Sequence, residues 1–203
     1  MTKGNPTGKI NLNRLTAIRT GLVLSRHKAS LQSEFKKDYN VISLKSFNDN
    51  GIYDHSYIDS FESDGNIKDE NLIRKGDILF RLREPNNAIY IDKDYEDTIV
   101  SSLAIIIRVV NDNINPIYLT HYLNSSMVKK QLFKDITVGS IPMTKVKDVE
   151  NLLIDVPPLE TQEKLASMQQ LAIKEIKLLE SLILEKQQYR KSIFEKIINQ
   201  EIK

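Results

Sequence analysis

The chain has 203 residues, of which 40% are hydrophobic and 28% charged, and these values are typical of a soluble globular protein. Its net charge of only +2 excludes a uniformly basic nucleic-acid binder, and no stretch approaches the roughly 18 apolar residues of a membrane span. The absence of cysteine excludes disulfides and thiolate metal sites and suits a cytoplasmic protein. The three histidines, His27, His55 and His121, are well separated, so no metal site is expected.

The first 45 residues are basic, with nine Lys or Arg against two acids, whereas residues 46–70 contain seven acids and one lysine. This asymmetry allows a local basic face that contacts phosphates. Two runs of solvated surface would give the same pattern. Within the basic run, Arg26 and Lys28 could follow a phosphate backbone, and a solvated loop is the alternative interpretation.

The pattern of residues 1–158 predicts a compact domain of mixed strands and helices. The β-branched run 99–110 predicts one or two buried strands, and shorter strands are expected at 41–44 and 77–82. Asn115-Pro116 favours a helix start that turns Ile117, Leu119, Tyr122 and Leu123 inward, and a second short helix is expected at 128–133.

Arg81 and Arg83 flank Leu82 at the end of a predicted strand, so their side chains point to the same side if the segment stays extended. They lead into a loop that contains Asn86 and Asn87. Two guanidinium groups and two amides together would suit hydrogen bonding to base edges in a DNA groove. The alternative is a pair of surface arginines at a strand end.

Two further segments are candidates for DNA contact. Gly139 and Ser140 offer backbone N–H groups for a phosphate, with Lys145 nearby, although an ordinary turn explains them equally well. Lys45 and Asn48 could also reach a groove.

The last quarter of the chain predicts one long helix, because residues 159–198 contain neither Pro nor Gly and Pro157-Pro158 precede them. Thr161 is the expected N-cap. About 40 helical residues would span roughly 60 Å, more than one compact domain covers, so the apolar seam predicts a partner helix. Packing of the helix against its own domain is the alternative. The seam residues follow a 4-3 spacing: Ala172, Ile176, Leu179, Ile183, Lys186, Arg190, Ile193 and Ile197.

No catalytic motif is found. The stretch 155–159, DVPPL, lacks the adjacent Asp/Asn-Pro-Pro-aromatic pattern of adenine methyltransferases, and no Gly-rich nucleotide loop is present. The triplets at 34–36 and 175–177 are isolated, and we interpret them as solvated segments rather than as part of a nuclease site. The sequence therefore predicts a non-catalytic protein with no cofactor of its own.

Three stretches resemble the family of specificity (S) subunits of Type I restriction-modification systems. They are 72–80, LIRKGDILF; 138–145, VGSIPMTK; and 153–165, LIDVPPLETQEKL, in which Thr161 replaces the acid usual before the Gln. The resemblance covers most of the chain. It implies an α+β target-recognition domain, residues 1–158, followed by a long C-terminal coiled-coil helix, residues 159–203, for dimerisation and methyltransferase docking.

The resemblance implies a sequence-specific DNA-recognition subunit that acts with methyltransferase subunits, and it allows a restriction (nuclease) subunit to join them. Family members usually have two recognition domains, whereas this chain has one. A half-length member can restore the full plan as a homodimer through its helix, so that two domains read a gapped bipartite site, an inverted repeat if the chains are identical. Two alternatives stay open: a coiled-coil interaction or regulatory protein that does not read DNA, and one half of a heteromeric split S subunit.

Overall fold

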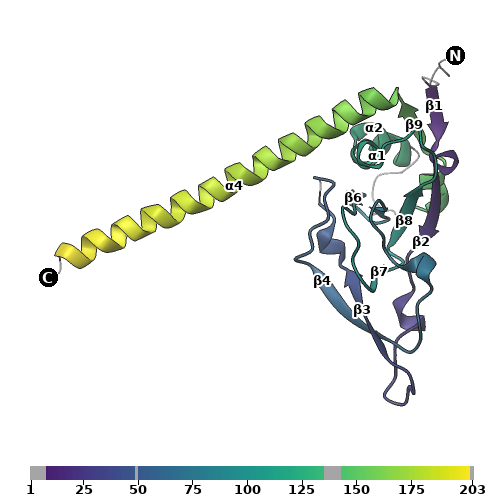
Figure 1. Cartoon of the computed structure of the whole chain (residues 1–203), viewed down its shortest axis with the longest axis horizontal. Coiled ribbons are helices and arrows are strands. Elements are labelled where there is room, and N and C mark those ends of the chain that lie inside the picture. Colours follow the sequence, from purple (N-terminus) through teal and green to yellow (C-terminus); the bar gives the residue numbers. More distant parts are fainter. Residues whose placement is uncertain (1–7, 49, 135–142, 202–203) are drawn as a thin grey trace. The chain divides into compact units, whose positions relative to one another are not determined.

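The computed structural model describes residues 8–48, 50–134 and 143–201. The chain divides into two compact units at residues 164 and 165, and each is described here by itself. The first unit combines three small sheets with short helices, and the second consists of most of one long helix (Figure 1). The predicted α+β domain followed by a long C-terminal helix is confirmed.

A four-stranded antiparallel sheet forms the centre of the first unit. Its order is β2 (Thr16–Thr20), β8 (Ala104–Val109), β5 (Ile78–Arg81) and β6 (Ala88–Tyr90). Consecutive residues of β5 and β8 are buried, so both faces of these central strands are covered. The fully buried Ile and Leu side chains of these strands explain why their sequence reads as a continuous apolar run.

A second sheet has three strands in the order β4 (Ile58–Ser63), β3 (Lys37–Ile42) and β7 (Thr98–Val100). Strand β3 pairs antiparallel with β4 and parallel with β7. Tyr39 and Val41 pack on one face with Ile67 and Ile99. The run predicted at 99–110 therefore forms two strands, as expected, and they belong to two different sheets.

Strand β1 (Gly8–Asn11) pairs antiparallel with β9 (Leu153–Val156), so the two ends of the first unit lie together. The sequence pattern did not predict either strand. Asp155 was interpreted only as part of the stop before the helix, because Pro157 and Pro158 dominate that segment.

The short helices confirm two predictions and correct one detail. Helices α1 (Pro116–Leu123) and α2 (Ser126–Leu132) lie where they were expected, and Asn115 caps α1 by accepting hydrogen bonds from two backbone N–H groups. Ile117 is only half-buried, and Tyr118 occupies the inner face instead. Helix α3 spans Val146–Glu150. The remaining turns are 3-10 helices: η1 Leu12–Arg14, η2 Leu24–Arg26, η3 Leu44–Ser46 and η4 Asp69–Asn71.

Helix α4 spans Leu159–Glu201, 43 residues, which corresponds to about 65 Å at 1.5 Å per residue. It begins directly after Pro158. Thr161 therefore lies inside the first turn, where its N–H donates to the carbonyl oxygen of Pro158 at 2.8 Å, and it is not the N-cap. The prediction of Thr161 as the cap was wrong because the helix begins at Leu159, three residues earlier than a cap at Thr161 would place its start.

Candidate nucleic-acid interface

The turn between β5 and β6 carries the predicted arginine pair. Arg83 is exposed and Arg81 is half-buried at the last position of β5. Asn86 and Asn87, however, are only 2% exposed each. The expected surface cluster of two guanidinium groups and two amides is therefore not present, because both amides are packed inside the turn. The surface of this turn consists of Arg83, Glu84 and Pro85, with part of Arg81.

Two other predicted residues lie beside this turn or near it in the fold. The N–H of Thr144 donates to the carbonyl oxygen of Leu82 at 2.9 Å, which places the exposed Lys145 next to the turn. Asn48 belongs to a loop that reaches β6 through a hydrogen bond from Tyr90 N to Gly51 O. Its Nδ2 donates to Ile52 O at 3.1 Å, so the amide holds its own loop together. Gly139 and Ser140 lie outside the described residues.

Lys45 is exposed on the 3-10 helix η3. The residues at the start of the neighbouring strand β4 add exposed apolar surface. The hydroxyl of Ser46 donates to Tyr57 O at 2.9 Å, which fixes η3 against the start of β4. Tyr57 and Ile58 are 46% and 40% exposed. A cation beside exposed apolar side chains suits a DNA groove, where phosphates and thymine methyl groups are close together.

Arg26 and Lys28 form a separate group. They are exposed, and their segment runs along β4 through hydrogen bonds from Asp64 N to His27 O and from Ala29 N to Glu62 O, both 2.9 Å. The structure thus distributes the predicted cations over two sheets, with Arg26 and Lys28 on the three-stranded sheet and Arg81 and Arg83 on the four-stranded one. It does not bring all of them into one cluster.

The Gly-Asp pair at the start of β5 has a structural role that the sequence did not reveal. Gly76 has a φ of +90°, which favours glycine. Asp77, whose side chain is 3% exposed, accepts from Arg108 Nε at 2.8 Å and Nη2 at 3.1 Å. Arg108 also donates to the carbonyl oxygens of Glu70 and Leu72. This ion pair anchors the segment that leads into the arginine turn.

Gln162 joins the start of α4 to the first unit. The side chain is fully buried. Its Oε1 accepts from Asn115 N at 2.8 Å, and its Nε2 donates to the carbonyl oxygens of Asn113 at 2.9 Å and Pro157 at 2.8 Å. The glutamine of the Pro-Pro-Leu-x-x-Gln stretch is therefore a clasp between the α1 cap and the α4 entry, which sequence spacing alone could not show.

Two tyrosines of α1 complete this junction. The hydroxyl of Tyr118 donates to Asp155 O at 2.8 Å, and that of Tyr122 donates to Asp155 Oδ2 at 2.7 Å. Burial, with smaller contributions from Tyr122 and Asp155, raises the pKa of Tyr118 to about 12. Both tyrosines therefore stay protonated donors at neutral pH and fix β9 against α1.

Gln162→Ala is expected to lower the free energy of unfolding by about 2–4 kcal/mol, because three backbone groups lose their partner in a buried place. Thermal or urea unfolding followed by circular dichroism measures this change. Gln188→Ala, at an exposed position of the same helix outside the seam, is the matched control and should change the unfolding free energy by less than about 0.5 kcal/mol. Equal effects of the two variants would contradict the clasp.

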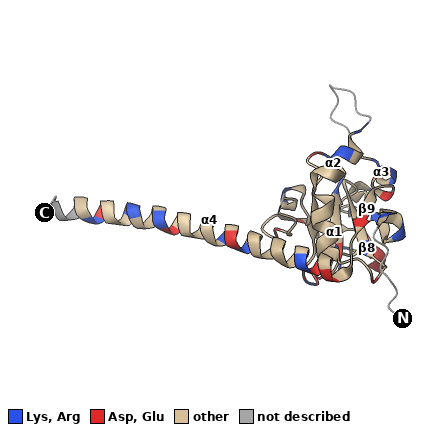
Figure 2. Ribbon diagram, turned by 90° about the horizontal axis from the view of Figure 1, so that it is seen from above, with Lys and Arg blue, Asp and Glu red and all other residues tan. Residues whose placement is uncertain are grey.

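The predicted seam of α4 is exposed along its length. Ile176, Leu179 and Ile183 are 44%, 52% and 58% exposed. Ile193 and Ile197 are 39% and 51% exposed, and Ala172 is also exposed. Lys, Arg and Glu residues are interspersed along the same helix (Figure 2). An apolar row of this length on a charged helix is the pattern of a helix that pairs with another one.

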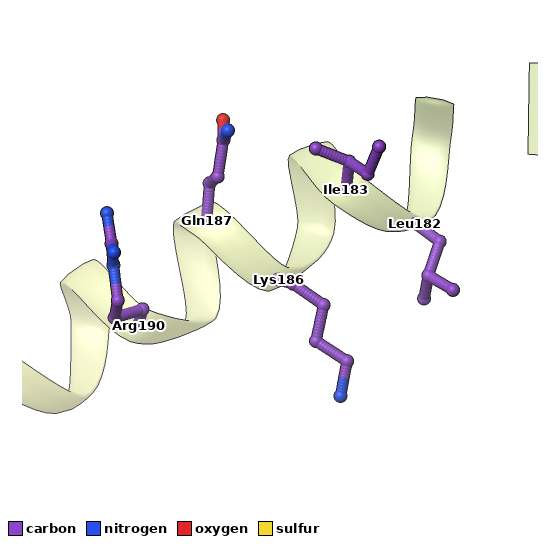
Figure 3. Close-up of a pocket in the computed structure, with 5 residues that line it drawn as sticks. All are labelled: Leu182, Ile183, Lys186, Gln187 and Arg190. Atoms are coloured by element: carbon purple, nitrogen blue, oxygen red, sulfur yellow. The ribbon is translucent and has the colours of Figure 1, made fainter. Parts of the chain in front are cut away.

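Two consecutive positions of the seam, Lys186 and Arg190, are polar. Figure 3 shows Ile183, Gln187 and Arg190 projecting from one side of α4, while Leu182 and Lys186 project from the other. These five side chains line a shallow, largely apolar depression on the helix surface. The depression is open to solvent on the single chain.

Neither a cluster of metal ligands nor a membrane-spanning helix is found among the described residues. Residues 8–48, 50–134 and 143–201 contain no group of three or more His, Cys, Asp or Glu that could hold a metal ion. Within the same ranges, no helix combines the length and the hydrophobicity required to cross a bilayer.

Comparison with known proteins finds a family model and solved structures that match this chain. A family model described as the Type I restriction modification DNA specificity domain matches residues 12–188. The HsdS subunit from Thermoanaerobacter tengcongensis is 21% identical, with a TM-score of 0.65, over 93% of this chain and 48% of that chain. A structure from work on complex assembly and conformational transition of the type I R-M system is 19% identical, with a TM-score of 0.65, over 91% and 47%. The chain thus spans about half the length of these chains. No curated protein matches it.

Proposed function

The chain belongs to the Type I restriction-modification DNA specificity domain family, and we propose that it is the DNA-reading subunit of such a system. The observation that carries the proposal is the combination of one recognition unit with one long helix whose apolar seam is exposed. The first unit would contact DNA through Arg81, Arg83, Lys45 and Lys145.

We propose that two copies pair through α4. A helix of 43 residues with exposed Ile and Leu at heptad spacing buries this surface most simply against an identical helix. Since the chain spans about half the length of the solved HsdS chain, two copies supply the same amount of protein as one of those chains. Two recognition units on such a pair would read two half-sites with a fixed gap, and identical chains would read an inverted repeat.

The chemistry would belong to partner subunits. Methyltransferase subunits would dock on the paired helices and methylate adenine, and a nuclease subunit could join them. This chain supplies recognition, so we assign it no catalytic residue and no cofactor. Its role in the reaction is to fix where on the duplex the methyltransferase acts.

The arginine turn provides the test of DNA reading. Arg81→Ala combined with Arg83→Ala should weaken binding of the reconstituted complex to its target duplex by about 30-fold or more, because each bidentate contact of an arginine with a base edge is worth about 1–3 kcal/mol. Binding to a scrambled duplex should change less. Fluorescence anisotropy at fixed salt concentration measures both affinities.

Arg81→Lys with Arg83→Lys is the matched control, since it keeps the charge but removes the guanidinium geometry. This pair should retain the affinity for the scrambled duplex and still lose discrimination. If the alanine pair leaves discrimination unchanged, the arginine turn does not read DNA. If the unaltered complex binds no DNA at all, the chain is an interaction protein with the family fold.

A further inference from the structure

Several backbone hydrogen bonds hold the turn between β5 and β6. Arg81 N donates to Asn87 O and Asn87 N donates to Pro85 O, both at 2.9 Å. Leu82 O accepts from Thr144 N at 2.9 Å. The turn is thus held in place by hydrogen bonds at both of its ends.

The side chains inside the turn are not satisfied in the same way. Oδ1 of Asn86, Oδ1 of Asn87 and Nε of Arg81 are buried, and none has a hydrogen-bond partner among the described residues. Asn86 uses only its Nδ2, which donates to Arg81 O at 3.0 Å. Buried polar atoms are nearly always paired, so three unpaired atoms in one turn call for a functional explanation.

A neighbouring amide shows that this region can satisfy such groups. Asn124, at the junction of α1 and α2, accepts from Ala88 N at 2.6 Å through Oδ1 and donates to Ala88 O at 2.9 Å through Nδ2. Ala88 directly follows the turn. Packing at this place is therefore compatible with a fully paired asparagine, whereas Asn86 and Asn87 keep free acceptors.

On the basis of the proposed function, we infer that this turn is a latent base-reading element that opens when DNA binds. The exposed Arg83 meets the duplex first. Asn86 and Asn87 then rotate outward, and their Oδ1 atoms accept hydrogen bonds from the exocyclic amino groups of adenine or cytosine in the major groove. Arg81 Nε donates to a base acceptor. The closed turn thus stores buried polar groups whose partners come from the target site.

Asn87→Leu tests this inference, because leucine has a similar size and removes the unpaired amide. The melting temperature of the chain alone should stay the same or rise. Asn124→Leu is the matched control and should lower the melting temperature, because its partners on Ala88 are lost. In the reconstituted complex, Asn87→Leu should weaken binding to a duplex that contains the motif methylated by the system by about 5- to 100-fold. Binding to a scrambled duplex should change little.

The outcomes separate the inference from the proposed function. A melting temperature that falls as far for Asn87→Leu as for Asn124→Leu would show that the amide is structurally paired, and it would overturn the inference. Unchanged discrimination by the Asn87→Leu complex would also overturn it while leaving the proposed function intact. An unaltered complex that does not distinguish the two duplexes would instead reject the proposed function.

Discussion

A chain that carries both Leu179→Asp and Ile183→Asp is expected to be monomeric at concentrations where the unaltered chain is a dimer. The two residues are 52% and 58% exposed on the single chain and occupy the middle of the seam. Pairing would bury them, and four carboxylates in an apolar interface without partners cost several kcal/mol. The dissociation constant of the dimer should rise on the order of 1,000-fold or more.

Sedimentation equilibrium measures the change, and circular dichroism verifies that the recognition unit stays folded. Ser181→Asp combined with Leu184→Asp adds the same charge to the same helix outside the seam, and this control pair should remain dimeric. A dimer that survives the seam variant would reject pairing through this face of α4. Dissociation by both pairs would show that helix charge, not seam burial, controls assembly.

Asp77→Ala is expected to lower the free energy of unfolding by about 3–5 kcal/mol, because it leaves Arg108 without its counter-ion. The Asp77 carboxylate is 3% exposed and Arg108 is 26% exposed, so water compensates little of the loss. Arg108 also bonds the carbonyl oxygens of Glu70 and Leu72, and the whole segment before β5 would loosen with it.

Denaturant unfolding of the purified chain measures this effect. Asp59→Ala removes the same charge from an exposed position of β4 and should change the unfolding free energy by less than about 0.5 kcal/mol. If Asp77→Ala and Asp59→Ala have similar effects, the Asp77–Arg108 pair does not stabilise the fold.

The helical part of the fold could be predicted because its signals are local. The absence of Pro and Gly after Pro158 and the spacing of Ile176, Leu179 and Ile183 define α4 without any tertiary information. The start of α1 at Asn115-Pro116 is local in the same sense. The precise cap of α4 was missed because Thr161 is a good capping residue that lies two residues inside the helix.

The site could be predicted only in part, because burial depends on contacts between distant segments. Asn86 and Asn87 are polar residues in a loop, and nothing in their spacing indicates that the turn closes over them. Gln162 bonds Asn113 and Asn115, residues 49 and 47 positions away. Strands β1 and β9 pair although they come from opposite ends of the sequence of the first unit. Neither strand therefore has a local signal that separates it from a loop.

Modified-base sequencing of host DNA, with and without the gene for this chain, tests the central claim most directly. We predict that removal of the gene abolishes adenine methylation at one gapped motif whose two halves form an inverted repeat. Loss at a gapped but asymmetric motif would contradict the homodimer and require a different second half-subunit. Unchanged methylation at every motif would contradict the role of the chain in DNA specificity.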